Sequence, residues 1–177
     1  MTLDDLQAAY NGESNAKAKY LAFAQTADAE GYGAVASLFR AAAAAEEIHA
    51  TAHARVIRSL GAQPQAEIHT PQPQSTPQNL QAAIEGETYE FKTMYPEFIA
   101  RARTAGQKAA VRSFEDAMAA EVEHARLYGQ ALANLAQWKG PARDFWVCPV
   151  CGYTTDSAPQ ADCPVCNAKK EKFRVVR

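Results

Sequence analysis

Two short segments of the chain place a glutamate and a histidine three residues apart. Residues 46–49 read Glu-Glu-Ile-His, and residues 121–124 read Glu-Val-Glu-His. Side chains three residues apart on a helix project from one face, so each pair is able to chelate one metal ion. A further glutamate precedes each segment, Glu13 by 33 residues and Glu87 by 34. The same set of candidate ligands therefore occurs twice, which indicates an approximate internal two-fold repeat.

The number of charged groups on these faces favours a dinuclear metal site. A single glutamate on a helix is most simply a solvated side chain, but four carboxylates and two imidazoles on inward-facing stripes are costly to bury without compensation. Carboxylate and imidazole ligands together suit iron or manganese, and zinc also fits. Glu90 follows Glu87 by one helical turn and adds a seventh candidate. The predicted ligands are Glu13, Glu46, His49, Glu87, Glu90, Glu121 and His124.

A second candidate site lies near the end of the chain. All four cysteines fall within the last thirty residues, as the pairs Cys148 and Cys151, and Cys163 and Cys166. Two Cys-x-x-Cys knuckles make a tetrahedral four-sulfur site, and a reducing compartment favours a metal over disulfides. Iron and zinc both fit this geometry.

The elements that position these residues are read from the apolar spacing and from proline. Two long helices are expected over residues 3–60, separated by a turn at residues 31–33, and two more over residues 78–104 and 107–138. The proline-rich segment 61–79 is long enough to cross the whole bundle. This predicts a mainly α fold, a four-helix bundle with one long crossover and ferritin-like topology.

Composition sets the domain organisation and limits the partners. The bundle is expected over residues 1–140, and residues 144–177 are expected to form a small β module stapled by metal. The chain has 177 residues and a net charge of −2, which argues against nucleic acid or an anionic membrane as the main partner. Neither a secretory signal nor a run of about 18 apolar residues is found in the sequence, so a cytoplasmic protein is expected.

These motifs together resemble the rubrerythrin family, over essentially the whole chain. The resemblance rests on the segments Gly12-Glu13-Ser14, Glu46-x-x-His49, Glu87-x-x-Glu90, residues 90–98, Glu121-x-x-His124 and the paired Cys-Pro-Val-Cys. It implies a ferritin-like di-iron domain followed by a rubredoxin-like domain with one iron held by four cysteines. One departure is Asn167, which stands where many rubredoxin-like knuckles carry glycine; a positive φ is expected there, and asparagine tolerates it better than most residues.

The resemblance also implies an activity. The protein would be a peroxidase that reduces hydrogen peroxide to water in oxidative-stress defence, with electrons arriving through the four-cysteine iron from a rubredoxin or an NAD(P)H-dependent reductase. Glu90 and His49 would exchange as iron ligands with redox state, and Glu90, Tyr20 and Tyr95 are the catalytic candidates. His53, one turn beyond His49, is more simply a surface or core histidine than a neighbour of the metals.

The distance along the chain between the two candidate metal sites bears on how electrons would pass between them. Fourteen helical residues separate His124 from Trp138, or about 21 Å, which predicts that the cysteine module stays near the end of the bundle. A neighbouring subunit is then the expected electron acceptor, and the resemblance implies head-to-tail homodimers. The alternative function is an iron-binding ferroxidase or storage protein whose cysteine module is a structural zinc ribbon.

Overall fold

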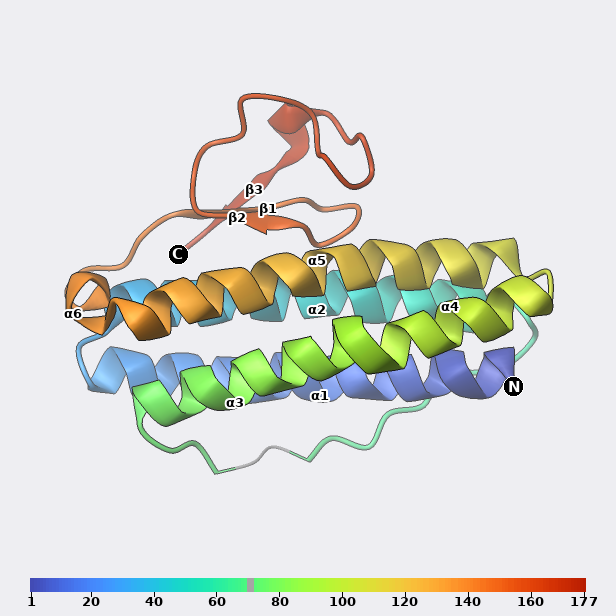
Figure 1. Cartoon of the computed structure of the whole chain (residues 1–177), viewed down its shortest axis with the longest axis horizontal. Coiled ribbons are helices and arrows are strands. Elements are labelled where there is room, and N and C mark those ends of the chain that lie inside the picture. The colour runs from blue at the N-terminus through green and yellow to red at the C-terminus, as the bar shows by residue number, and fades with distance from the viewer. Residues whose placement is uncertain (70–71) are drawn as a thin grey trace.

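The computed structural model describes residues 1–69 and 72–177. The long helices lie side by side, and a small sheet sits over one face of them (Figure 1). The helices are α1 (Thr2–Ala29), α2 (Gly33–Ser59), α3 (Thr76–Tyr89), η1 (Glu90–Met94), α4 (Tyr95–Thr104), α5 (Lys108–Ala133) and α6 (Leu135–Trp138). α3, η1 and α4 follow one another as a single stretch, so the main body is a four-helix bundle.

The connection between α2 and α3 confirms the predicted crossover. α2 ends at one end of the bundle and α3 begins at the other, with the segment between them running along the outside of α1 (Figure 1). Thr70 and Pro71, inside the predicted linker, lie outside the described residues. α3 begins at Thr76, before the predicted residue 78, because Ser75 and Gln78 form a capping box and proline fits the first turn of a helix.

Side-chain amides on α1 hold the crossover in place. Gln7, Asn11 and Asn15 are spaced one turn apart and bond to the backbone of residues 63–69. Asn15 donates to the carbonyl of Glu67 and accepts from the amide of His69. These bonds satisfy backbone groups that no regular element pairs.

Two helical irregularities differ from the expected elements. A π-helical turn, η1, occupies residues 90–94 just before Pro96, whose missing amide hydrogen cannot continue the α-helical pattern. The fourth helix stops at Ala133 because Asn134 leaves the helical conformation, and α6 is a separate short helix. The expected continuous helix over residues 107–138 is therefore interrupted.

The apolar core is divided into two clusters, one toward each end of the bundle. The first includes Phe39, Leu80 and Tyr128, and the second includes Leu6 and Phe114.

Within the described residues, no helix is long and apolar enough to span a membrane.

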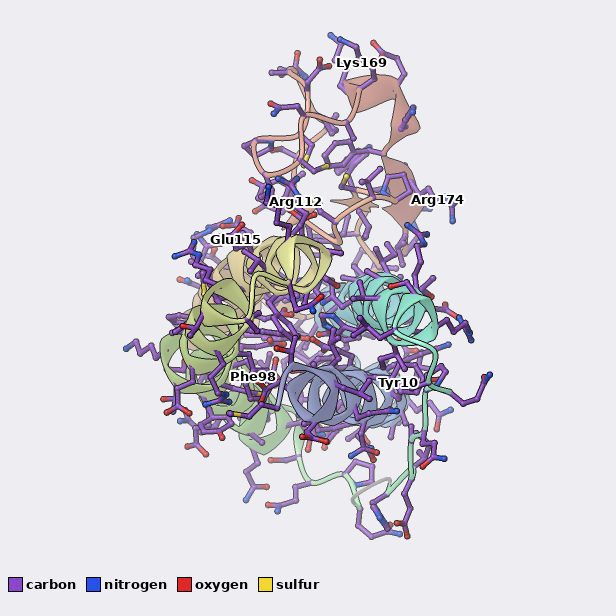
Figure 2. The ribbon with its side chains drawn as sticks, turned by 90° about the vertical axis from the view of Figure 1, so that its right-hand side faces the viewer. Tyr10, Phe98, Arg112, Glu115, Lys169 and Arg174 are labelled. Carbon is purple, nitrogen blue, oxygen red and sulfur yellow. The ribbon has the colours of Figure 1, made fainter. Side chains whose placement is uncertain are left out.

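The cysteine module is a three-stranded antiparallel sheet laid across the bundle. Its strands are β1 (Phe145–Val147), β2 (Thr154–Thr155) and β3 (Arg174–Val176), in the order β2-β1-β3, with the 3-10 turn η2 (Lys170–Lys172) before β3. Seen along the bundle, the module stands over α2 and α5, with Lys169 at its outer tip (Figure 2). Phe145 and Val147 pack into the first core cluster.

The position of the module corrects the sequence-based expectation. The cysteine module does not lie at the end of the bundle. The chain turns back at Gly140, whose backbone is hydrogen-bonded to Gly31 and Gly33. A Cβ atom on Gly33 would lie 2.5 Å from the Gly140 carbonyl oxygen, so this contact requires glycine. The extended residues that follow carry the module back over the middle of α2 and α5 (Figure 1). The distance argument for a neighbouring subunit as electron acceptor is therefore wrong.

Candidate dinuclear metal centre and cysteine site

Acidic and imidazole side chains from four helical stretches meet inside the bundle. Each of these residues is at most 2% exposed, although carboxylates are rarely buried without partners. They are Glu13 from α1, Glu46 and His49 from α2, Glu87 from α3, and Glu121 and His124 from α5. Six of the seven residues predicted as ligands are thus brought together.

These six residues form two overlapping groups of four. Within each group, one candidate ligand atom from every residue lies within 4.8 Å of the others. Glu13 and His49 belong to the first group, Glu87 and His124 belong to the second, and Glu46 and Glu121 belong to both. A carboxylate shared by two groups is placed to bridge two ions, so the arrangement is that of a dinuclear centre.

The hydrogen bonding of the carboxylates tests whether cations fit. Five buried carboxylate oxygens of these residues have no hydrogen-bond partner among the described residues: Glu13 Oε2, Glu46 Oε1, Glu87 Oε2 and both oxygens of Glu121. Buried polar atoms are normally paired, and an unpaired carboxylate oxygen is costly. Two cations between the groups would supply the missing partners, so the residues fit a pair of metal ions.

Burial and mutual repulsion set the protonation of these groups when no cation is bound. Burial raises the pKa of Glu46 and Glu87 well above the usual value, and repulsion from Glu121 adds to the effect. Burial opposes the charged form of His49, but the neighbouring Glu121 and Glu46 outweigh it and raise the His49 pKa. Metal ions and protons therefore compete for the same atoms.

Glu90, the seventh predicted ligand, is set apart from the other six. It begins the π-helical turn, is partly buried and belongs to neither group of four. Burial raises the pKa of Glu90, and the charges of Glu13 and Glu121 raise it further.

Three buried tyrosines line the centre. The Tyr20 hydroxyl donates to Glu87 Oε1, and the Tyr95 hydroxyl donates to Glu13 Oε1. Both tyrosines were singled out from the sequence, whereas Tyr128, whose ring centre is 5.5 Å from that of Tyr20, was not distinguished from other apolar core positions. Burial raises the pKa of all three hydroxyls, so each keeps its proton.

The four cysteines form the second predicted site. Sγ atoms of Cys148 and Cys166 are 3.6 Å apart, as are those of Cys151 and Cys163. Four sulfurs about 2.3 Å from one central ion would have comparable separations. The knuckles are alike, because Gly152 and Asn167 both have positive φ and donate amide hydrogens to the first cysteine of their pair. The expectation for Asn167 is confirmed.

Both histidines of the dinuclear centre contact the cysteine module of the same chain. Nε2 of His49 is 3.0 Å from the carbonyl oxygen of Cys151, and Nε2 of His124 is 3.1 Å from Oγ1 of Thr154, which donates to the carbonyl of Gly152. The Cys151 carbonyl oxygen only accepts, and the Thr154 hydroxyl gives its hydrogen to Gly152, so each Nε2 carries a hydrogen and each Nδ1 faces the carboxylates. The module thereby orients both rings.

Gly152 and Thr154 are neighbours of the two histidines that sequence reasoning missed. A Cβ atom on Gly152 would overlap Nε2 of His49, so only glycine allows this approach. Thr154 is fully buried between the module and α5. Neither position has a sequence signal, because both contacts depend on the path of the chain after Gly140.

A ferritin-like bundle with a dinuclear carboxylate and histidine centre, joined to a four-cysteine module, defines a class of two-site iron proteins. The rubrerythrin family model matches residues 4–132, and the model for the rubrerythrin rubredoxin-like domain matches residues 146–174. The chain belongs to the rubrerythrin family. It accordingly has a di-iron site and a rubredoxin-like cysteine site.

Individual relatives agree with this assignment. Rubrerythrin-2 of Clostridium acetobutylicum is 37% identical over 98% of this chain and 96% of the relative. Nigerythrin of Nitratidesulfovibrio vulgaris is 39% identical over 97% of this chain and 85% of the relative. A structure of fully reduced, all-ferrous nigerythrin matches 99% of this chain and 86% of its own with a TM-score of 0.92 and 36% identity. Mycobacterium tuberculosis bacterioferritin, at 21% identity over 77% of this chain and 86% of its own and a TM-score of 0.69, shares the bundle fold.

Proposed function

We propose that this protein is an oxidoreductase that reduces hydrogen peroxide to water, with electrons relayed through its own cysteine site. The observation that carries the proposal is the pair of contacts from residues 151–154 to His49 and His124. A storage protein needs no redox module. It also has no need for such a module to be hydrogen-bonded to the histidines of its metal centre.

The proposed ligands are the six residues of the two groups, with Glu46 and Glu121 as bridges. Two ferrous ions held by these residues would supply the two electrons that reduction of one peroxide requires. Conversion of one peroxide to two waters also consumes two protons. We propose that the hydroxyls of Tyr20 and Tyr95 hold protons at the centre, because Tyr20 donates a hydrogen bond to Glu87 and Tyr95 donates one to Glu13.

The proposed electron path stays within one chain. It runs from the cysteine site through the backbone of Cys151, across one hydrogen bond to His49 Nε2, and through the imidazole ring to Nδ1. A rubredoxin or an NAD(P)H-dependent reductase would supply electrons to the cysteine site. A head-to-tail homodimer remains a prediction that a solution mass measurement tests, and this path does not require one.

Glu90 and His49 are proposed to exchange as ligands when the redox state changes. Here His49 Nδ1 lies 2.9 Å from Glu121 Oε1 and 3.0 Å from Glu46 Oε2, whereas Glu90 stands outside both groups. Glu90 begins a π-helical turn, and such turns inside α-helices are frequent at functional sites.

The test is anaerobic reduction of the iron-loaded protein followed by one equivalent of hydrogen peroxide. Rapid return of the thiolate-to-ferric absorption, with no mineral formed, supports the peroxidase. Slow peroxide turnover with mineral accumulation would support iron storage instead. A colourless protein with zinc on its cysteines would exclude the proposed relay.

A further inference from the structure

His53 lies one turn beyond His49 on α2 and belongs to neither group of candidate ligands. Its side chain is fully buried, and both ring nitrogens have partners. Nδ1 lies 2.7 Å from the Ser113 hydroxyl on α5, and Nε2 lies 3.1 Å from the Tyr95 hydroxyl on α4. His53 thus joins three helices next to the metal centre.

The direction of these hydrogen bonds follows from the hydrogens available. Tyr95 has one hydroxyl hydrogen and donates it to Glu13, so its oxygen accepts from Nε2 of His53. In the neutral ring, whose one N–H hydrogen is then on Nε2, Nδ1 accepts from the Ser113 hydroxyl 2.7 Å away. The chain of donors therefore runs from Ser113 to His53 to Tyr95 to Glu13.

Aromatic rings also pack against the His53 ring. The centre of the His53 ring lies 5.4 Å from that of Phe114 and 6.0 Å from that of Tyr95. Nε2 is 3.8 Å from Glu13 Oε1, too far for a direct hydrogen bond, so His53 acts on the carboxylate through the tyrosine. Other rotamers of Tyr95 would leave a buried imidazole nitrogen unpaired.

We propose that His53 is a positioning residue that holds the Tyr95 hydroxyl with its hydrogen on Glu13, and that Ser113 fixes the tautomer that allows it. This inference deepens the proposed function, because it assigns the orientation of one of the two proton-holding tyrosines. Groups that orient a metal-bound carboxylate typically change metal affinity or activity by roughly tenfold or more when removed.

Three substitutions separate the two nitrogens of the ring. His53→Gln retains an N–H donor near the Nε2 position, His53→Asn retains a group only near the Nδ1 position, and His53→Phe retains neither. We expect kcat for peroxide to fall roughly tenfold in the Phe and Asn variants with KM unchanged, and the Gln variant to recover most of the loss. Exposed His69 provides the control, because His69→Phe should leave kcat unchanged.

A spectroscopic readout on the metal-free protein makes the test independent of catalysis. The tyrosine bands of ultraviolet resonance Raman spectra report whether the phenol oxygen accepts a hydrogen bond, and Tyr95→Phe identifies the Tyr95 contribution. We expect the accepting signature in wild type and in His53→Gln, and its loss in His53→Phe and His53→Asn. An unchanged Tyr95 signature in all three would overturn the inference, whereas absent peroxide turnover in wild type would overturn only the proposed function.

Discussion

Nε2 of His49 and the carbonyl oxygen of Cys151 are 3.0 Å apart, although 102 residues separate them in the chain. One partner belongs to the dinuclear centre and the other to a cysteine of the four-sulfur site. Because His124 makes the matching contact with Thr154, the module supports both halves of the centre. The two metal sites are therefore expected to influence each other through backbone and side-chain geometry.

Gly152→Ala tests how closely the two sites must approach. The added methyl group would overlap Nε2 of His49, and the residue would also hold a positive φ. We expect the module to be displaced, so that a carrier reduces the cysteine site normally while oxidation of that site by peroxide slows. Stopped-flow absorption at the thiolate-to-ferric bands measures both steps.

Gly61→Ala is the matched control for this substitution. Gly61 has φ +82 and nothing within 4 Å of its Cβ position, so it carries the conformational strain without the overlap. A loss of about 1–2 kcal/mol in the free energy of unfolding and normal electron transfer are expected. Equal slowing of electron transfer in both variants would show that strain, and not contact with His49, is responsible.

Thr154→Val removes the hydroxyl that accepts from His124 and keeps the shape of the side chain. The buried His124 N–H and the Gly152 carbonyl would then lose their partner, at a cost of about 1–3 kcal/mol in unfolding free energy. Iron affinity of the dinuclear centre should fall roughly tenfold or more, as measured by competition with a chelator. Thr155→Val, in the same strand, should retain wild-type affinity.

Cys148→Ser separates the two metal sites chemically. The serine oxygen is a poor substitute for a thiolate, so the four-sulfur site should lose iron while the bundle keeps its two ions. Reduction of the dinuclear centre by a rubredoxin-type carrier should fall to the rate seen without carrier. A variant whose centre is reduced as fast as wild type would mean that electrons enter elsewhere.

Glu90→Ala tests the residue that stands outside both ligand groups. Because Glu90 is only partly buried, the fold and thermal midpoint should change little. Peroxide turnover should drop by about tenfold or more if this carboxylate joins the centre during the cycle. Circular dichroism checks the fold, and wild-type turnover would count against a ligand role.

Much of the fold was predictable because its determinants are local. Glu-x-x-His repeats locate the metal centre on helix faces. The length of the linker predicted the topology of the bundle, because only a long segment reaches from the end of α2 to the start of α3 at the opposite end (Figure 1). Six ligand candidates converge as their spacing indicated.

The docking of the cysteine module was not predictable, because no local pattern encodes it. The direction of the chain after Trp138 is set by two backbone hydrogen bonds, one that Gly140 donates to Gly31 and one that it accepts from Gly33, and both glycines are distant in sequence. His53 was judged more simply a surface or core residue for a similar reason: its partners, Ser113 and Tyr95, come from other helices. Contacts between elements need three-dimensional information that periodicity lacks.

The return of the chain at Gly140 has a consequence for biosynthesis. Every carboxylate and imidazole of the dinuclear centre is translated by residue 124, yet the outer nitrogens of both histidines are capped only by residues 151–154. During synthesis, the bundle therefore has all six ligands before the contacts that orient the two histidines exist. Orientation of both histidines therefore depends on a segment that is synthesised after all six ligands, so a chain that stops at residue 140 would hold the ligands without these two contacts.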